Sequence, residues 1–201
     1  MEPGVDSIRQ EKAAIRKAAL ARRDALSPDD RLNASRALAN PAMSFLRTVT
    51  GETVSGFWPI RSEIDPRWIM RALADRGASL ALPSIEGGRL VFRHFVFGER
   101  LRRAGFGLSE PFSDATEATP ALMLVPLAAF DRRGGRIGYG KGYYDGAIER
   151  LIALGRRPRT LGLAFSCQEV PSIPIEPHDR RLDAILTEHG LILAQQVPAA
   201  R

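Results

Sequence analysis

The apolar positions in the first 46 residues follow helical spacing. Ser7 to Gln10 resembles a capping box, and it opens a helix that we expect to run to about Leu26. Ser27 then starts a second helix as its N-cap, with Pro28 and two acidic residues in the first turn. Pro41 is expected to break or kink that helix. Its apolar face carries Leu32, Leu38, Phe45 and Leu46.

Beyond residue 50 the pattern changes to short apolar strands that alternate with helices. One helix is predicted after Asp65 and ends at Gly77, and another ends at Gly155. Strands are predicted over residues 53–58, 79–83, 90–96, 122–125, 160–165 and 182–187, with a further short one at 191–193.

Alternating strands and helices predict an α/β fold with a largely parallel sheet that is covered on both faces. Residues 98–119 and 166–181 have the composition of connections between such elements. The chain shows no internal repeat and no low-complexity linker, so residues 1–201 are predicted to form one domain.

The 201 residues carry a formal net charge of +6, and only three of the 29 basic residues are lysines. A basic chain suits nucleic acids and equally well small ligands with several negative charges. The arginines are scattered along the chain, which is typical of a solvated surface. The hydrophobic content of 44% predicts a sizeable core.

Cys167 is the only cysteine, so no internal disulfide can form, and this fits a reducing compartment. We expect Cys167 to be a buried small residue and not a nucleophile or metal ligand. The amino terminus lacks the apolar segment of a signal peptide, and no apolar run is long enough to span a bilayer. The expected location is the cytoplasm, without a membrane partner.

The residues that suit chemistry concentrate between Asp131 and Asp145. This glycine-rich stretch holds five glycines, four cationic residues and three tyrosines, and it lies between an apolar strand and a helix. A strand, a glycine loop and a helix start direct backbone N–H groups and the helix dipole at phosphate oxygens. Gly138 to Gly142 would let the backbone approach a ligand closely. The cations would neutralise phosphate, and Asp145 could hold Mg²⁺.

The spacing excludes a Walker A loop and the dinucleotide-binding fingerprint, and the chain has no Gly-x-Ser-x-Gly elbow. The plain alternative is a flexible hairpin tip, although such tips rarely combine Arg136, Lys141, paired tyrosines and a carboxylate. Tyr143 and Tyr144 could stack on an aromatic heterocycle, or one of them could pack into the core at the helix start.

Candidate ligand contacts elsewhere also have a structural alternative. Lys12 and Arg16 share one helix face, which suits either a phosphate clamp or a solvated surface. Trp58 and Glu63 follow a strand end, where α/β sheets bind ligands. Trp58 could wall an aromatic pocket or belong to the core. Glu63 could bind an amine-bearing ring or serve as an acid at a helix N-terminus.

Asp145 and Asp183 are candidate Mg²⁺ ligands, with substrate phosphates and water completing the shell. Asp183 alone is equally typical of a sheet edge or a hydrogen-bonded core position. The histidines show no metal-ligand spacing; they are His94, His178 and His189.

Residues 130–145 closely resemble the signature of the 5-formyltetrahydrofolate cyclo-ligase family, also called 5,10-methenyltetrahydrofolate synthetases. The long glycine motif is the most specific part of a resemblance that covers nearly the whole chain in the expected order. Shorter similarities lie at residues 12–16 (a basic helix), 58–65 (a folate-side segment), Glu110-Pro111 and 178–188.

The resemblance implies a three-layer α/β/α fold and a reaction that depends on ATP and Mg²⁺. In the family, the formyl oxygen of 5-formyltetrahydrofolate attacks the γ-phosphate of ATP, N10 closes on the phosphorylated imine, and phosphate leaves. The products are 5,10-methenyltetrahydrofolate, ADP and phosphate. This chemistry needs charge neutralisation and alignment more than a protein nucleophile. The substrate would be a reduced folate, with or without a polyglutamate tail, and the protein a monomer or weak dimer.

Carried over position by position, the resemblance implies three sets of residues. The set implied for ATP is Lys12, Arg16, Arg136, Ile137, Gly138, Tyr139, Gly140, Lys141, Gly142, Tyr143 and Tyr144. The set implied for folate is Trp58, Glu63, Tyr139, Gly140, Lys141, Gly142 and Tyr143. Arg136, Lys141 and Tyr143 would be catalytic, and Asp145 and Asp183 would hold Mg²⁺.

Two other functions are compatible with the residues. A catalytically silent relative could bind RNA through the basic surface, although the chain lacks an aromatic–basic RNA-recognition signature, which argues against nucleic acid. An enzyme of the same class could act on another N-formyl or carboxylate compound that ATP activates.

Overall fold

The computed structural model describes residues 5–46 and 49–194. Seven strands form its central sheet: β1 (Thr53–Ser55), β2 (Ser79–Glu86), β3 (Arg89–His94), β6 (Leu122–Pro126), β9 (Arg159–Leu163), β10 (Ala184–Thr187) and β11 (Gly190–Leu193). Two-residue strands form two small hairpins: β4 (Arg102–Arg103) with β5 (Ser109–Glu110), and β7 (Ala129–Phe130) with β8 (Arg136–Ile137).

The strand order in the central sheet is β11-β10-β9-β6-β1-β2-β3. The five inner strands are parallel to their neighbours, and only the edge strands β3 and β11 run antiparallel. The inner strands are almost continuously apolar, because a parallel sheet with helices on both faces buries both sides of each strand. The predicted α/β fold with a mostly parallel sheet is confirmed.

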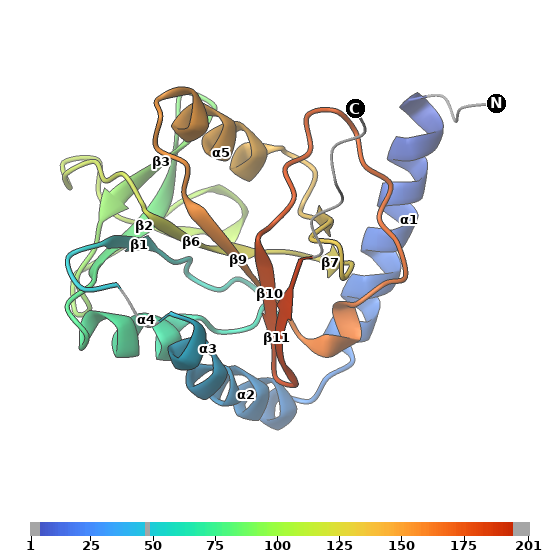
Figure 1. Ribbon diagram of the computed structural model, residues 1–201, viewed down its shortest axis with the longest axis horizontal. Coiled ribbons are helices and arrows are strands. Elements are labelled where there is room, and N and C mark those ends of the chain that lie inside the picture. The colour runs from blue at the N-terminus through green and yellow to red at the C-terminus, as the bar shows by residue number, and fades with distance from the viewer. Residues whose placement is uncertain (1–4, 47–48, 195–201) are drawn as a thin grey trace.

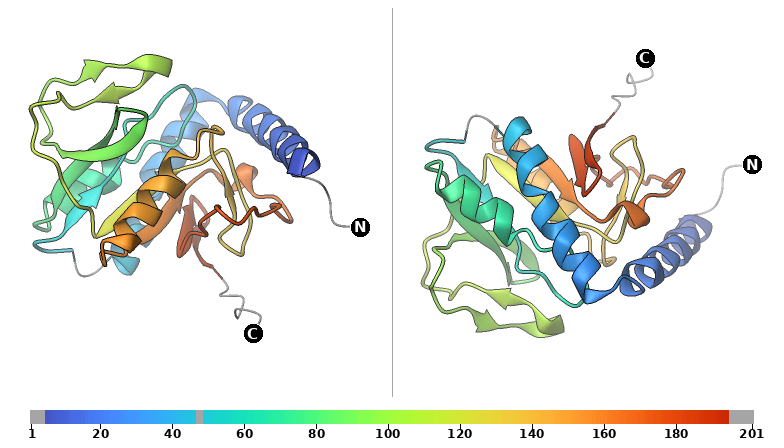
Figure 2. Two further views of the ribbon diagram at one scale, coloured as in Figure 1. Left: turned by 90° about the horizontal axis from the view of Figure 1, so that it is seen from above. Right: turned by 90° about the horizontal axis from the view of Figure 1, so that it is seen from below.

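Five helices accompany the sheet: α1 (Val5–Asp24), α2 (Pro28–Ala37), α3 (Ala39–Phe45), α4 (Arg67–Ala74) and α5 (Tyr143–Ala153). Figure 1 shows α2, α3 and α4 on one face of the sheet and α5 on the other, and Figure 2 shows the same layers from above and below. Two short 3₁₀ turns, η1 (Gly105–Gly107) and η2 (Ser166–Gln168), lie in the connections. None of the described helices combines the length and apolar character needed to cross a membrane.

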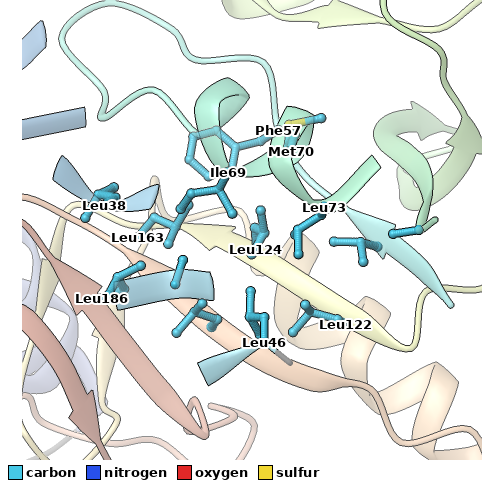
Figure 3. Packing of buried hydrophobic residues seen from close by; sticks show 14 of the residues in the cluster. Leu38, Leu46, Phe57, Ile69, Met70, Leu73, Leu122, Leu124, Leu163 and Leu186 are labelled. Carbon is cyan, nitrogen blue, oxygen red and sulfur yellow. The ribbon is translucent and has the colours of Figure 1, made fainter. Parts of the chain in front are cut away.

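Each face of the sheet has its own core. On one face, Ile69, Met70 and Leu73 of α4 pack over leucines of the central strands, and all are fully buried (Figure 3). On the other face, Ala147, Ile148 and Leu151 of α5 pack against a separate cluster. Burying a leucine or isoleucine contributes about 1.5–3 kcal/mol, so these two clusters hold the layers together.

The interruption expected at Pro41 occurs three residues earlier, because α2 ends at Ala37 and α3 begins at Ala39. A proline ring clashes with the carbonyl group four residues before it, which here is that of Ala37. Pro41 therefore falls in the first turn of α3, where its missing N–H leaves no helical hydrogen bond unmade.

α1 lies apart from the three layers, beside β7 and η2 (Figures 1 and 2). Ala19 of α1 is fully buried in a small apolar cluster with Ala129, Ile137 and Ile173. This contact fixes α1 beside the β7–β8 hairpin, which leads directly into Gly138.

Candidate active site

A cavity of about 880 Å³ opens at the carboxyl ends of the central strands. Phe57 and Trp58, which follow β1, and Pro126, the last residue of β6, lie on its wall. The chain continues from β1 to β2 on one side and from β6 to β9 on the other, so the strand order reverses between β1 and β6. Open α/β sheets bind ligands at such a point, because the diverging loops leave a crevice.

The glycine-rich stretch forms one wall of this cavity from Arg136 to Asp145. Gly140 and Gly142 have left-handed backbones, with φ of +86° and +65°. Gly142 is the N-cap of α5 and provides no side-chain cap, so the first N–H groups of this 11-residue helix are available to a ligand. The helix dipole adds partial positive charge at the same end, and together these features suit an anion.

α1 supplies three cations to the cavity wall: Arg9, Lys12 and Arg16. Arg16 Nε donates a hydrogen bond to the carbonyl oxygen of Gly138 at 2.7 Å. Burial lowers the pKa of Arg16 from its ordinary value. Lys12 and Arg16 lie on one face of the helix, as their spacing predicts, and that face borders the cavity. Their contact with phosphate stays a prediction.

Lys12 is held by two carboxylates of the segment that follows η2. Its Nζ lies 2.7 Å from Glu176 Oε2 and 2.5 Å from Asp179 Oδ2. Burial opposes protonation of Lys12, but the hydrogen bonds to Asp179 and Glu176 outweigh it and raise the pKa of the amine. His178 Nε2 lies 3.8 Å from Asp179 Oδ1. Glu176, His178 and Asp179 each have one possible metal-ligand atom, and these atoms lie within 4.8 Å of one another. Histidine spacing along the chain did not indicate this cluster.

Arg136 and Lys141 differ sharply in their surroundings. Arg136 is buried, donates to Asp145 Oδ1 at 2.8 Å and also binds the carbonyl oxygen of Arg180. The backbone N–H of Arg180 donates to the same Asp145 oxygen at 2.9 Å. Lys141 is exposed on the cavity wall and has no hydrogen-bond or ion-pair partner among the described residues. Lys141 is therefore free to pair with a bound anion.

The predicted pairing of Asp183 with Asp145 is not supported by the structure. Asp183 precedes β10 and does not line the cavity. Its carboxylate accepts hydrogen bonds from the backbone N–H and the hydroxyl group of Thr160, at the start of β9, and lies 3.3 Å from Arg157. The starts of β9 and β10 lie at the end of the sheet opposite the carboxyl ends where the cavity opens. Asp183 therefore connects the starts of these two strands through Thr160.

Trp58 and Glu63 line a second part of the cavity wall, next to Tyr139 of the glycine-rich stretch. Their contact with folate stays a prediction. Trp58 packs edge-on against Phe95, with ring centroids 5.8 Å apart. The Arg67 guanidinium lies 4.9 Å from the centroid of the Trp58 ring, and bidentate hydrogen bonds to Asp65 hold it there. These contacts fix a flat apolar surface on the cavity.

Glu63 is held by hydrogen bonds at both carboxylate oxygens. The Tyr139 hydroxyl donates to Oε1 at 2.8 Å, and the backbone N–H of Ile60 donates to Oε2 at 2.9 Å. Burial raises the pKa of Glu63, and these two donors and nearby arginines partly offset the effect. Burial and the charge of Glu63 raise the pKa of Tyr139 to about 12.

Tyr143 and Tyr144 begin α5 and are both partly buried against the core beneath it. This confirms the expectation that at least one of them packs at the helix start. Both rings also line the cavity. The Tyr144 hydroxyl oxygen is buried and has no hydrogen-bond partner within the described residues, and burial raises its pKa.

Two side chains beside this wall had no individual role in the sequence predictions. Glu110 is 2% exposed, lines the cavity, and accepts hydrogen bonds from Ser84, Arg102 and the backbone of Ile85. It joins the β4–β5 hairpin to the end of β2. Arg23 is 1% exposed and lies behind Tyr139. A buried arginine near the end of an otherwise solvated helix has no signature in a single sequence.

Known proteins are similar to this chain in sequence and in fold. A sequence profile of the 5-formyltetrahydrofolate cyclo-ligase family matches residues 8–188. The 5-formyltetrahydrofolate cyclo-ligase of Escherichia coli (strain K12) is 28% identical over 173 residues, which cover 83% of this chain and 94% of that protein. The Mus musculus protein of the same name is 25% identical over 194 residues, or 90% of this chain and 96% of its own length.

Solved structures agree with these sequence matches. The 5,10-methenyltetrahydrofolate synthetase of Aquifex aeolicus aligns with a TM-score of 0.72 and 26% identity, covering 94% of this chain and 96% of that one. The Mycoplasma pneumoniae synthetase shares the fold with a TM-score of 0.71 and 23% identity, covering 89% of this chain and 99% of its own. With a profile match over residues 8–188 and the glycine-rich stretch on the cavity wall, the chain belongs to the 5-formyltetrahydrofolate cyclo-ligase family.

Proposed function

We propose that this protein converts 5-formyltetrahydrofolate to 5,10-methenyltetrahydrofolate and that the reaction consumes ATP. One observation carries the proposal: the glycine-rich stretch, the cations of α1, and the Trp58–Glu63 wall all border one cavity at the reversal point of the sheet. A cyclo-ligase must hold two substrates in contact, and this cavity has one part rich in cations and another that is aromatic and acidic.

The cationic wall suits the triphosphate. The start of α5 offers backbone N–H groups, Arg16 and Arg136 supply fixed positive charge, and Lys141 has no partner that a phosphate oxygen would need to displace. Phosphoryl transfer requires alignment and neutralisation of charge on the phosphate oxygens. We assign Lys141 to the transferring group because it is exposed, lines the cavity and has no partner among the described residues.

The part of the wall formed by Trp58 and Glu63 suits the pterin. Trp58 offers an apolar face for a flat ring system, and an ionised Glu63 accepts hydrogen bonds from ring N–H and amino groups. In this arrangement the formyl oxygen attacks the γ-phosphorus and ADP leaves. N10 then bonds to the formyl carbon, loses its proton, and phosphate departs with the formyl oxygen.

The acidic residues at the cationic wall fit a divalent cation. Glu176 and Asp179 already hold the ammonium group of Lys12 between two carboxylate oxygens, which are the ligands Mg²⁺ prefers. We propose that these two residues would hold Mg²⁺. The metal role of Asp145, whose carboxylate binds Arg136 and the Arg180 N–H, stays a prediction. The bound metal would neutralise part of the phosphate charge, and Lys12 would then be free to bind a phosphate oxygen.

The near-ultraviolet absorbance of the methenyl product tests the proposal. Purified protein with 5-formyltetrahydrofolate, Mg²⁺ and ATP should show a rise that is absent without ATP. Protein that binds ATP but gives no rise would refute the folate substrate and favour another N-formyl or carboxylate compound. The cytoplasmic location, the monomeric or weakly dimeric state and the polyglutamate tail stay predictions.

Lys141→Ala should lower turnover by about 10²–10³, the loss typical of one charge-stabilising group in a transition state. Lys17→Ala is the matched control, because Lys17 is an exposed lysine of α1 that does not line the cavity. Equal rates for the two variants would remove Lys141 from the mechanism.

A further inference from the structure

A chain of hydrogen bonds connects Arg23, behind the cavity, to the carboxylate of Glu63. Arg23 Nη1 donates to the Tyr139 hydroxyl oxygen at 3.2 Å, and that hydroxyl donates to Glu63 Oε1 at 2.8 Å. Arg23 Nε donates to Ser62 Oγ at 2.9 Å, and Ser62 in turn donates to Asp24. Arg23 itself does not line the cavity, so it acts on a ligand only through other residues.

The burial of Arg23 makes this arrangement informative. Its side chain is 2% exposed, whereas that of Asp24, the carboxylate in its ion pair, is 62% exposed and 3.9 Å from Nε. A buried guanidinium is costly unless nearby negative charge compensates it. Tyr139 places the partly buried carboxylate of Glu63 one hydroxyl group away. The fold therefore connects a buried cation to a carboxylate on the cavity wall through a shared hydroxyl.

We propose that Arg23 is a positioning residue that, through Tyr139, orients Glu63 and keeps it ionised for recognition of the pterin. The inference rests on the proposed function, in which Glu63 accepts hydrogen bonds from the ring. Only the ionised carboxylate is acceptor-only. The Tyr139 hydroxyl holds one oxygen and the Ile60 N–H holds the other, so the remaining lone pairs of both oxygens are available to a ligand in the cavity.

The charged and titratable groups around Glu63 include Arg23, Arg61, Tyr139 and Tyr144, with Asp24 bound to Ser62 beside Arg23. Burial raises the pKa of Glu63, and both arginines lower it. Arg61 is exposed on the cavity rim, where solvent screens its charge, whereas Arg23 is buried. Removing Arg23 should therefore raise the pKa of Glu63 further. As the pH is lowered, the variant should then lose folate binding at a higher pH than the wild type does.

The experiment uses the full-length protein, four single variants and one double variant. Arg23→Met removes the charge and keeps the length of the side chain, Arg23→Lys restores the charge, and Tyr139→Phe removes the connecting hydroxyl. Arg22→Met is the matched control, because Arg22 is the adjacent arginine of α1 and its side chain binds the carbonyl oxygen of Cys167 instead. The measurements are calorimetric affinities for 5-formyltetrahydrofolate and for ATP across pH, and a ¹³C NMR titration of the Glu63 carboxyl group.

Arg23→Met should weaken folate binding about tenfold or more, leave ATP affinity within about twofold, and raise the pKa of Glu63. Arg23→Lys should recover most of the pKa change. The double variant Arg23→Met with Tyr139→Phe should bind folate no more weakly than the poorer single variant, because both changes break one connection.

Equal losses of folate and ATP affinity with an unchanged Glu63 pKa would assign Arg23 a purely structural role and overturn the inference. Independent, additive effects of the two single changes would also overturn it. If the wild type binds no 5-formyltetrahydrofolate, the proposed function fails, while the carboxyl titration needs no ligand and still decides whether Arg23 controls Glu63.

Discussion

Gly140 is the position where one methyl group should disturb the phosphate-facing wall most directly. Its φ is +86°, and a side chain there would lie 3.4 Å from Nη2 of Arg16. Gly138, two residues earlier, has an ordinary φ and nothing within 4 Å of the corresponding position. Gly140→Ala and Gly138→Ala thus form a matched pair within one loop.

The strain can be estimated from the backbone. A left-handed conformation costs a residue with a Cβ about 1–2 kcal/mol. The contact with Arg16 adds little, because the end of a flexible side chain can move, but that movement disturbs the hydrogen bond from Arg16 to Gly138. Gly140→Ala should therefore lower the free energy of unfolding by about 1–2 kcal/mol, which corresponds to about 2–8 °C in melting temperature for a chain of this length.

Urea unfolding of both variants and the KM for ATP provide the test. Gly138→Ala should change stability by no more than about 0.5 kcal/mol. Gly140→Ala should lose stability and also raise the KM for ATP, because Arg16 no longer sits in its original position. Equal stability of the two variants would refute the assignment of strain to Gly140. An unchanged KM for ATP would contradict a contribution of Arg16 to ATP binding.

Two further predictions concern carboxylates. Burial alone would raise the pKa of Asp131, but the backbone N–H groups of Ile173, Gly135 and Arg133 outweigh it and lower that pKa. Its contribution to stability is then complete above the ordinary carboxyl pKa of about 4 and is lost as the pH falls through the lower folded value. Between about pH 5 and 2, the urea midpoint of the wild type should fall more steeply than that of Asp131→Asn, and parallel slopes would contradict this. Asp179→Asn should raise the Mg²⁺ concentration needed for half-maximal activity, whereas Asp183→Asn should leave it unchanged; the reverse result would restore Asp183 as the ligand.

The order of the elements could be predicted because their signals are local. Parallel inner strands read as apolar runs, and Ser27 followed by Pro28 marks a helix start in any context, as the hydrogen bond from Asp30 N–H to Ser27 Oγ confirms. The break before Pro41 was misplaced because the clash acts on Ala37, four residues away. The hairpins β4–β5 and β7–β8 were not predicted because two-residue strands leave almost no periodic pattern.

The site could be predicted where its residues are adjacent in sequence and not where they come from separate segments. The glycines and cations between Arg136 and Asp145 lie close together in the sequence, so they predict a binding loop without knowledge of the fold. Asp183 was paired with Asp145 through the family resemblance, but the carboxylates near Lys12 come from residues 176–179, and only the folded chain brings them to α1. The role proposed for Arg23 depends on the burial of its side chain, which the polar pattern of this helix does not predict.

α1 also fixes the distance between the cations at the cavity wall, Lys12 and Arg16, and Arg23 behind Tyr139. Lys12, Arg16 and Arg23 lie within about 40° of one another around a helix of 3.6 residues per turn, and about 16 Å separates the first from the last. One inserted residue between Arg16 and Arg23 would rotate Arg23 by about 100° relative to Arg16 and advance it by about 1.5 Å. Arg23 would then no longer point at Tyr139 while Lys12 and Arg16 stay at the cavity wall. Substitutions on the solvent side of α1 are compatible with this geometry, but a change in its length is not.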